Sequence, residues 1–286
     1  MKLCNIWGIG ALLPRDRTEP SKMHQADAIA FLKATHRTLT EQEDLSPNNP
    51  EVNNCLGALV ATLRAWQAAG FGAELSDHPD LADVAAGLPR LCAGAEVEME
   101  KWWCRKILAD PCPGAQALAA FWYLDEYRAL CQSELALLGD RRAERFAFLG
   151  SGALPLTAIL LAQSGPAICV ECVDRDGEAC ELAARLIALL GLADQVAVTE
   201  GDARDYRPSS EATLICASLL NAPGLYTRLS DARAERLLIR DAEGPYRFCY
   251  RPAPLPGRGF IERAKSPMST QRINTSRYFE ATGTPT

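Results

Sequence analysis

The stretch that decides the fold is Phe146-Ala-Phe-Leu-Gly-Ser-Gly-Ala-Leu-Pro155. Four apolar residues run directly into Gly150-Ser-Gly152, and a helical pattern follows from Leu156. Such an unbroken apolar run is typical of a strand buried on both faces of a sheet. The two glycines allow a sharp turn and let a ligand approach the backbone, because no Cβ stands in the way. The stretch therefore predicts the first strand and the nucleotide loop of a doubly wound α/β domain, although Pro155 stands where a dinucleotide-binding loop has its third glycine.

Strands and helices alternate from residue 144 onward, as a parallel sheet with crossover helices requires. Further strands are expected at 167–173, 195–199, 212–218 and 236–239, with helices at 156–164, 177–190 and 226–234 and an antiparallel edge hairpin at 259–264 and 273–279. Residues 1–142 carry helical patterns instead, at 24–39, 52–70, 88–108 and 121–138, and Asn48 or Asn49 can cap the second of them. We therefore predict a helical N-terminal domain over residues 1–142 and a Rossmann-like domain over residues 143–286.

Composition narrows the class of protein. The chain has 286 residues, of which 48% are hydrophobic and 23% are charged, as expected for a globular protein of two domains. Its formal net charge of −6 argues against binding to nucleic acid. No apolar run has the length of a membrane span or the form of a secretory signal. Eleven cysteines without a disulfide-like framework suit a reducing compartment, so a cytoplasmic location is expected.

Metal and redox chemistry find little support in the sequence. Cys169 and Cys172 form a Cys-x-x-Cys inside an expected strand, where an offset of three residues puts the two side chains on opposite faces. Core packing is favoured for this pair. His24, His36 and His78 show no spacing typical of a zinc site. We therefore expect no bound metal.

Acidic side chains follow two of the expected strands, at the edge where a parallel sheet binds its ligand. Asp174 comes directly after the second strand and is placed to accept hydrogen bonds from both ribose hydroxyls, since a carboxylate only accepts. Asp202 follows the third strand and is placed to accept from an adenine amino group. Either residue alone could simply cap a turn. Together with Gly150-Ser-Gly152 they predict an adenosine-containing ligand, and the Gly-Asp-Ala that ends at Ala203 favours S-adenosylmethionine over NAD.

Two further pairs of side chains stand out in the helical part of the chain. Glu96 and Glu100 are four residues apart and stack on one helix face, beside an apolar stripe that includes Trp103. Solvated surface is the usual explanation of such a pair. Tyr123 and Tyr127 also share a face, which most often indicates core packing. These two pairs gain a function only through a family resemblance.

Several segments resemble one family together. The segment Phe148-Leu-Gly-Ser-Gly-Ala-Leu-Pro-Leu-Thr157 is similar to Phe-Val-Gly-Ser-Gly-Pro-Leu-Pro-Leu-Thr of the nicotianamine synthases and their bacterial opine-metallophore relatives. Leu91-Cys-Ala-Gly-Ala-Glu-Val-Glu-Met-Glu100 resembles a Leu-Cys-x-x-Ala-Glu-x-x-x-Glu helix of that family. Similar segments, including one that begins with Arg240, extend the resemblance from about residue 44 to 279. Trp122 departs from it by replacing a proline, and Glu126 by replacing an asparagine, which puts the choice of acceptor in doubt.

The resemblance implies a Rossmann-like domain of the class I methyltransferase type and an unusual use of S-adenosylmethionine. The bacterial relatives transfer its 3-amino-3-carboxypropyl (aminobutanoyl) group to the amine of histidine and release methylthioadenosine. A partner opine dehydrogenase then completes a metal chelator of the staphylopine or pseudopaline type. Glu100 corresponds to the glutamate that handles the attacking amine, and Tyr127 to the tyrosine beside it; a half-buried carboxylate with a raised pKa would suit that task.

The other site residues follow from the resemblance and from the strand ends described above. The acceptor is expected to meet Glu96, Tyr123 and Arg240, the last of which has equally good structural uses. The residues expected to bind S-adenosylmethionine are Gly150, Ser151, Gly152, Leu154, Pro155, Asp174, Asp202 and Ala203.

Three alternatives stay open at the level of sequence. The first is a nicotianamine synthase proper, which condenses several donor molecules. The second is an ordinary small-molecule methyltransferase, and the third is a protein that binds an adenosine ligand without turning it over. The sequence also leaves open whether the chain forms a homodimer and whether L- or D-histidine is the acceptor.

Overall fold

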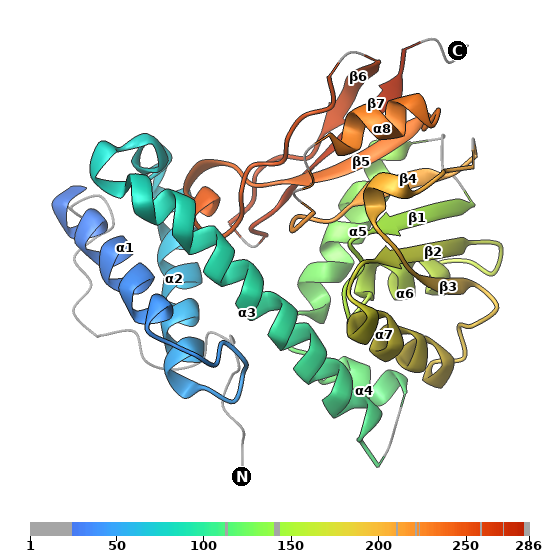
Figure 1. The fold of residues 1–286 in the computed structure, drawn as a ribbon, viewed down its shortest axis with the longest axis horizontal. Helices are drawn as coiled ribbons and strands as arrows, with labels where there is room; N and C mark the ends of the chain where they lie inside the picture. Colours follow the sequence, from blue (N-terminus) through green and yellow to red (C-terminus); the bar gives the residue numbers. More distant parts are fainter. Residues whose placement is uncertain are drawn as a thin grey trace. The chain divides into compact units, whose positions relative to one another are not determined.

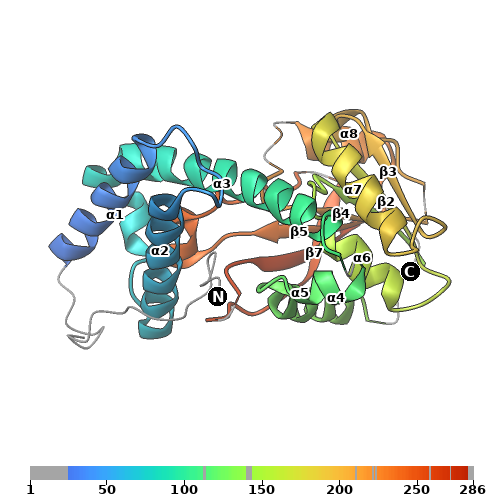
Figure 2. The same cartoon turned by 90° about the horizontal axis from the view of Figure 1, so that it is seen from below.

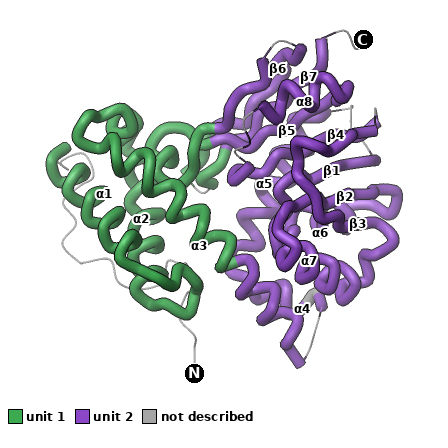
Figure 3. The backbone as a smooth tube through the Cα atoms, viewed as in Figure 1, with its two compact units in different colours: residues 1–99, 242–252, 268–274 green, residues 100–241, 253–267, 275–286 purple. Residues whose placement is uncertain are grey.

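The computed structural model divides the chain into two compact units (Figure 3). The first comprises residues up to 99 with 242–252 and 268–274, and the second comprises 100–241, 253–267 and 275–286. The structure describes residues 25–111, 114–139, 144–209, 211–220, 222, 224–257, 259–270 and 272–282. His24, with which the first helix was predicted to begin, lies outside them. The predicted domain boundary after residue 142 falls inside the second unit, because the helices between 115 and 138 go with the sheet.

The first unit is helical. It contains α1 (Gln25–Thr40), α2 (Pro50–Ala69), the first turns of α3 (Ala82–Leu108) and the 3₁₀ helices η2 (Glu74–Asp77), η3 (Pro79–Leu81) and η5 (Gly244–Phe248). Asn49 caps α2 as predicted, since its side chain accepts hydrogen bonds from the backbone N–H groups of Glu51 and Val52. Trp66 of α2 is fully buried and packs edge-to-face against Phe31 and Phe71.

Helix α3 is longer than the sequence pattern predicts. It begins at Ala82 rather than near Leu88, so Pro89 lies inside it. The proline removes one backbone hydrogen bond. Buried side chains on both sides of it, Val84 and Leu88 before and Cys92 after, keep the helix on the core. α3 passes from the first unit into the second between Met99 and Glu100.

A seven-stranded sheet forms the centre of the second unit (Figure 1). Its order is β3-β2-β1-β4-β5-β7-β6, with β7 antiparallel to both of its neighbours and the other pairs parallel. The strands are β1 (Arg145–Leu149), β2 (Cys169–Asp174), β3 (Val196–Glu200), β4 (Thr213–Cys216), β5 (Arg236–Asp241), β6 (Phe260–Lys265) and β7 (Thr275–Ala281). This arrangement confirms the predicted doubly wound domain and its antiparallel edge hairpin, because the order reverses next to β1.

Helices cover both faces of that sheet. They are α5 (Leu124–Leu138), α6 (Leu156–Gln163), α7 (Gly177–Leu189) and α8 (Leu225–Asp231), with the short helix α4 (Ala115–Ala119) before α5 and the 3₁₀ helix η4 (Ala203–Asp205) after β3. α5 and α6 lie side by side in both views (Figures 1 and 2). The helix predicted over 121–138 corresponds to α5, which begins at Leu124 and ends at Leu138. Among the described helices, none combines the length and the apolar composition needed to cross a membrane.

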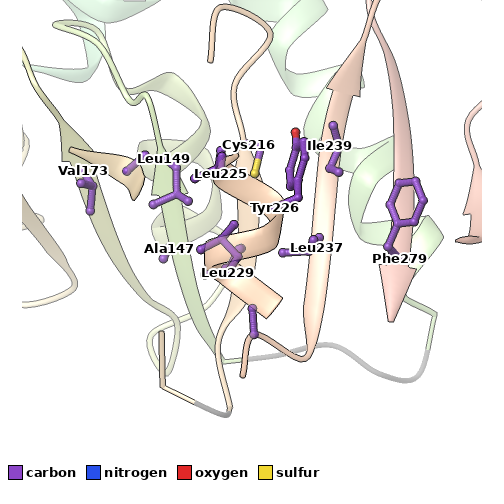
Figure 4. Packing of buried hydrophobic residues seen from close by; sticks show 13 residues of the cluster. Ala147, Leu149, Val173, Cys216, Leu225, Tyr226, Leu229, Leu237, Ile239 and Phe279 are labelled. Atoms are coloured by element: carbon purple, nitrogen blue, oxygen red, sulfur yellow. The ribbon is translucent and has the colours of Figure 1, made fainter. Parts of the chain in front are cut away.

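Strand β1 contributes to the cores on both faces, as an unbroken apolar run should. Ala147 and Leu149 belong to a buried cluster in which α8 packs on the sheet through Leu225 and Leu229 (Figure 4). Because side chains alternate along a strand, Phe146 and Phe148 point to the opposite face. Phe146 is also buried, so the strand is covered on both sides.

Candidate functional site

The loop after β1 turns sharply, and its backbone lies close to neighbouring side chains. Gly150 and Gly152 both have left-handed backbones, with φ of 74° and 66°, a conformation that favours glycine. A Cβ at Gly150 would lie only 3.3 Å from the Cβ of Ala217. Ser151 between them is buried and lies next to the thiol of Cys172. The loop thus has the sharp turn that the sequence predicts.

The two residues after the loop anchor it. Leu154 is buried in the core, and Pro155, which is also buried, occupies the N-cap position of α6 without a side-chain hydrogen bond. Their side chains fix where the helix begins. Their predicted contact with S-adenosylmethionine stays a prediction.

Asp174 joins the loop to the end of β2. Its Oδ2 accepts a hydrogen bond of 2.8 Å from the backbone N–H of Gly152, and its Oδ1 accepts one of 3.0 Å from the N–H of Asp176. The nucleotide loop and the acid predicted to meet the ribose are therefore joined by a hydrogen bond. A carboxylate has about four lone-pair positions, so Asp174 keeps acceptor capacity for a ribose.

Asp202 stands at the end of β3, as predicted, and caps η4. Its carboxylate accepts from the backbone N–H of Arg204 at 2.8 Å and pairs with the Arg204 guanidinium at 2.5 Å. These hydrogen bonds lower the pKa of Asp202 to about 2, so it is ionised at neutral pH. Ala203 is buried and its side chain belongs to the core cluster under α8. The turn-capping role that the sequence left open is thus realised at Asp202.

Glu100 lies directly against the glycine loop. Its Oε2 occupies the space that a Cβ on Gly152 would need, and its Cδ and Oε1 would lie 3.1 and 3.5 Å from that Cβ. Glu100 is half-buried, in the last turns of α3. Both residues belong to the second unit. The structure therefore brings together two parts of the predicted site that are 52 residues apart in sequence.

The predicted aromatic pair lies at the start of α5. The rings of Tyr123 and Tyr127 meet edge-to-face with centroids 5.7 Å apart, and both residues are half-buried. Trp122 packs on Tyr123 at 4.9 Å. Trp122, one of the two residues that depart from the family pattern, is therefore in contact with a residue expected to meet the acceptor.

Arg240 is engaged inside the protein, which argues against its predicted contact with a substrate carboxylate. It is 3% exposed and forms two hydrogen bonds to Glu134, of 2.8 and 2.9 Å, and one of 2.7 Å to Thr157. Burial alone would lower the pKa of Arg240, but the charge and hydrogen bonds of Glu134 outweigh it and raise that pKa. Ser276 donates a further hydrogen bond to Glu134. The sequence allowed either a substrate contact or a structural role for Arg240, and its contacts support the structural role.

Glu96 has a partner that the sequence did not suggest. Tyr250 donates a hydrogen bond of 2.7 Å to its Oε2, and both residues belong to the first unit. Glu96 is half-buried, so solvated surface alone does not describe it. Its predicted contact with the acceptor stays a prediction.

The Cys-x-x-Cys pair does not converge on a site. Cys169 is exposed and Cys172 is buried, on opposite faces of β2 as predicted, although core packing proves correct only for Cys172. Burial raises the pKa of Cys172 to about 12, which keeps it as a thiol. In the part of the chain that the structure describes, no group of three or more His, Cys, Asp or Glu residues is placed to hold a metal ion.

Sequence reasoning missed Glu134, Lys101 and Asp176, which take part in the ion pairs around the site. Glu134 has a visible signal, because it shares the helical stripe of Leu130 and Leu138 in α5 yet is charged. Asp176 precedes α7 at the N-cap position, which is also readable from sequence. Lys101 carries no such signal.

Comparison with known proteins identifies relatives of this chain. The family model described as "Nicotianamine synthase protein" matches residues 23–212. Nicotianamine synthase 9 of Hordeum vulgare is 36% identical over 170 residues, which cover 58% of this chain and 48% of the barley protein. L-histidine 2-aminobutanoyltransferase of Yersinia pestis is 40% identical over 176 residues, 60% of this chain and 64% of that protein. The matched region thus spans about half to two thirds of these relatives.

One solved structure shares the fold over nearly the whole chain. It is a mutant of MtNAS in complex with S-adenosylmethionine, with a TM-score of 0.75 and 22% identity, and the match covers 89% of this chain and 98% of that one.

Proposed function

The chain belongs to the nicotianamine synthase family, and on that premise we propose that it transfers the aminobutanoyl group of S-adenosylmethionine to the amine of histidine. Methylthioadenosine is the second product, and the aminobutanoyl-histidine serves the biosynthesis of an opine-type metallophore. The Yersinia pestis relative, 40% identical, is an L-histidine 2-aminobutanoyltransferase, which supports this choice of reaction.

The observation that carries the proposal is the placement of the Glu100 carboxylate on Gly152. A carboxylate in that position can take a proton from an amine held beside the loop. An amino-acid amine is mostly protonated near neutral pH and must lose a proton before it can attack. Tyr127 is proposed to help orient that amine.

S-adenosylmethionine supplies a sulfonium with three electrophilic carbons. The acceptor nitrogen attacks the methylene carbon of the aminobutyrate arm that is bonded to sulfur. The bond between that carbon and sulfur breaks, and its electron pair stays on sulfur in methylthioadenosine. Glu100 receives the proton that the nitrogen loses. The protein selects this carbon by aligning it with the nitrogen at near-attack distance.

The residues of the second unit fit the donor. Because Gly150 and Gly152 lack a Cβ, Ala217 and the Glu100 carboxylate can lie directly against the backbone of the loop. Asp174 carries an acceptor at the ribose position, within hydrogen-bond reach of the same loop. Asp202 is ionised and only partly buried, so it can accept from an adenine amino group while it holds Arg204. The MtNAS mutant of the same fold binds S-adenosylmethionine.

A second candidate is nicotianamine synthase activity itself, which the barley relative favours at 36% identity. In that case the acceptor amine comes from another donor molecule rather than from histidine. Trp122, where the family pattern has proline, touches the predicted acceptor residue Tyr123 and favours a different acceptor. A cytoplasmic location, the absence of a required metal and a partner opine dehydrogenase are predictions that accompany the proposal.

The test is a product analysis by mass spectrometry. The purified chain is incubated with S-adenosylmethionine alone, with L-histidine, with D-histidine and with a panel of other amino acids. We expect methylthioadenosine together with a product of the mass of histidine plus one aminobutanoyl group. Condensed donor units without histidine would establish the second candidate. Release of S-adenosylhomocysteine would identify a methyltransferase, and binding without any product would contradict the proposed enzyme.

A further inference from the structure

Lys101, the residue after Glu100, is buried beside the start of α7. Only 10% of its side chain is exposed, and its Nζ lies 2.7 Å from Oδ2 of Asp176 and 2.9 Å from Oε2 of Glu178. Burial alone would lower the pKa of Lys101, but the hydrogen bonds to these two acids outweigh it and raise that pKa. The ammonium is therefore charged and held by two carboxylates.

Asp176 connects this ion pair to the donor loop. Its side chain caps α7 by accepting from the N–H groups of Glu178 and Ala179. Its own N–H donates to Oδ1 of Asp174, whose Oδ2 accepts from the N–H of Gly152. A continuous series of hydrogen bonds thus runs from the Lys101 ammonium to the glycine loop.

The series closes on itself. Gly152 packs against the carboxylate of Glu100, which is the neighbour of Lys101 in α3. Five residues of the second unit therefore form a ring of contacts, and one of its links is a covalent peptide bond. Any shift of α3 relative to α7 moves Glu100 and the Asp174–Gly152 pair at the same time.

We infer that Lys101 is a positioning residue, which sets Glu100 at the donor loop by holding the end of α3 on the cap of α7. It does not touch the reacting atoms. It acts through Glu100 on one side and through Asp176 and Asp174 on the other. This role deepens the proposed transferase function and rests on it for its effect on turnover.

Arg105 provides a matched control. It lies one turn further along α3 and also contacts Glu178, so its removal costs the same helix one ion-pair partner. Its side chain is half exposed, however, and its observed ion pair is with Glu178, whereas the ion pair observed for Asp176 is with Lys101. If Lys101 merely stabilised α3, Lys101→Met and Arg105→Met would have similar effects on catalysis.

The test compares four single variants and one double variant by steady-state transfer kinetics and by hydrogen exchange of the Gly152 and Asp176 amides. Lys101→Met is expected to lower kcat by about 10- to 100-fold at temperatures well below its Tm, the scale of a misplacement of about 1 Å. Arg105→Met should keep kcat within about twofold of the unmodified chain. Lys101→Arg should recover much of the lost rate, since a guanidinium can pair with both acids.

Asp176→Asn removes the charge but keeps the cap, because asparagine caps helices as well as aspartate does. It should reproduce the defect of Lys101→Met, and the double variant should be no worse than either single one. Additive losses, or a normal kcat in Lys101→Met, would overturn the inference.

Exchange of the two amides does not depend on turnover. Lys101→Met should speed the exchange of both, and Arg105→Met should leave them unchanged. If the unmodified chain shows no transfer but Lys101→Met loses this protection, the proposed function fails and the ring stands. If the unmodified chain shows the expected transfer but Lys101→Met leaves the exchange of the two amides unchanged, the inference fails and the proposed function stands.

Discussion

The buried ion pair between Arg240 and Glu134 allows a quantitative prediction about a residue that the sequence assigned to the substrate. Both side chains are 3% exposed, and Arg240 also lies over the ring of Phe148 at 5.2 Å. Arg240→Met keeps the apolar stem but removes the guanidinium, which leaves the Glu134 carboxylate buried with the hydroxyl of Ser276 as its remaining observed partner. Breaking a buried pair in this way costs about 3–5 kcal/mol.

The magnitude is measured by urea unfolding of the single and double variants. Arg240→Met and Glu134→Leu should each lower the free energy of unfolding by about 3–5 kcal/mol, because each leaves one buried charge without its partner. The double variant Arg240→Met with Glu134→Leu should recover much of that loss, since two apolar side chains replace the pair. The coupling between the two positions should therefore be large and should exceed about 1 kcal/mol.

The opposite pattern would refute this reasoning. If Arg240 held the acceptor carboxylate, Arg240→Met would change stability by less than about 1 kcal/mol and would raise KM for histidine by about tenfold or more. If Arg240→Met is too unstable to purify, the double variant still separates the two roles. A double variant that is stable and keeps the normal KM supports the ion pair, and one that is stable with a greatly raised KM supports the substrate contact.

Three further predictions concern the loop, the ion pairs of α3 and the cysteines. Gly152→Ala should weaken binding of S-adenosylmethionine in calorimetry and abolish transfer, because a residue with a Cβ loses about 1–2 kcal/mol in this left-handed backbone conformation and the Glu100 carboxylate already fills the space that the Cβ needs. The control Gly165→Ala, where the nearest atom to the new Cβ lies 3.8 Å away, should bind the donor normally. Lys101 lowers the pKa of the two acids that it pairs with, so the stability that these carboxylates provide is present above their unfolded pKa of about 4 and is lost as pH falls through the lower folded values. The difference in unfolding free energy between the unmodified chain and Lys101→Met should therefore be largest at neutral pH and shrink below about pH 4. A difference that widens on acidification would contradict the pairing. Alkylation at mild alkaline pH, followed by peptide mass spectrometry, should label Cys169 readily and Cys172 hardly at all in the folded chain, because burial raises the pKa of the latter to about 12.

The sheet was predictable because its signals are local. Apolar runs that end in Gly150, Asp174 and Glu200 mark parallel strands and their carboxyl ends, and the observed order places all three at one edge. Helix limits were less accurate where packing overrides local propensity. The helix predicted to begin at residue 88 begins at Ala82 instead, and α3 continues through Pro89 because the residues on either side are buried.

The charged contacts around the site were beyond the sequence for a different reason. The contacts of Lys101 with Asp176 and of Arg240 with Glu134 join residues 75 and 106 positions apart. No periodicity or capping rule predicts which of 30 basic residues will meet which of 36 acids. The family resemblance suggested a substrate contact for Arg240, and only its burial and its partners indicate the structural role.

The most direct test of the central claim compares Glu100→Gln with the unmodified chain in one experiment. Calorimetry measures the affinity for S-adenosylmethionine, and the same samples are then given histidine and analysed for methylthioadenosine. If Glu100 is the base beside the donor loop, the variant should bind the donor within about threefold of the unmodified chain and lose at least about 100-fold in transfer rate, the scale of general base catalysis. Normal release of methylthioadenosine by Glu100→Gln would contradict the account.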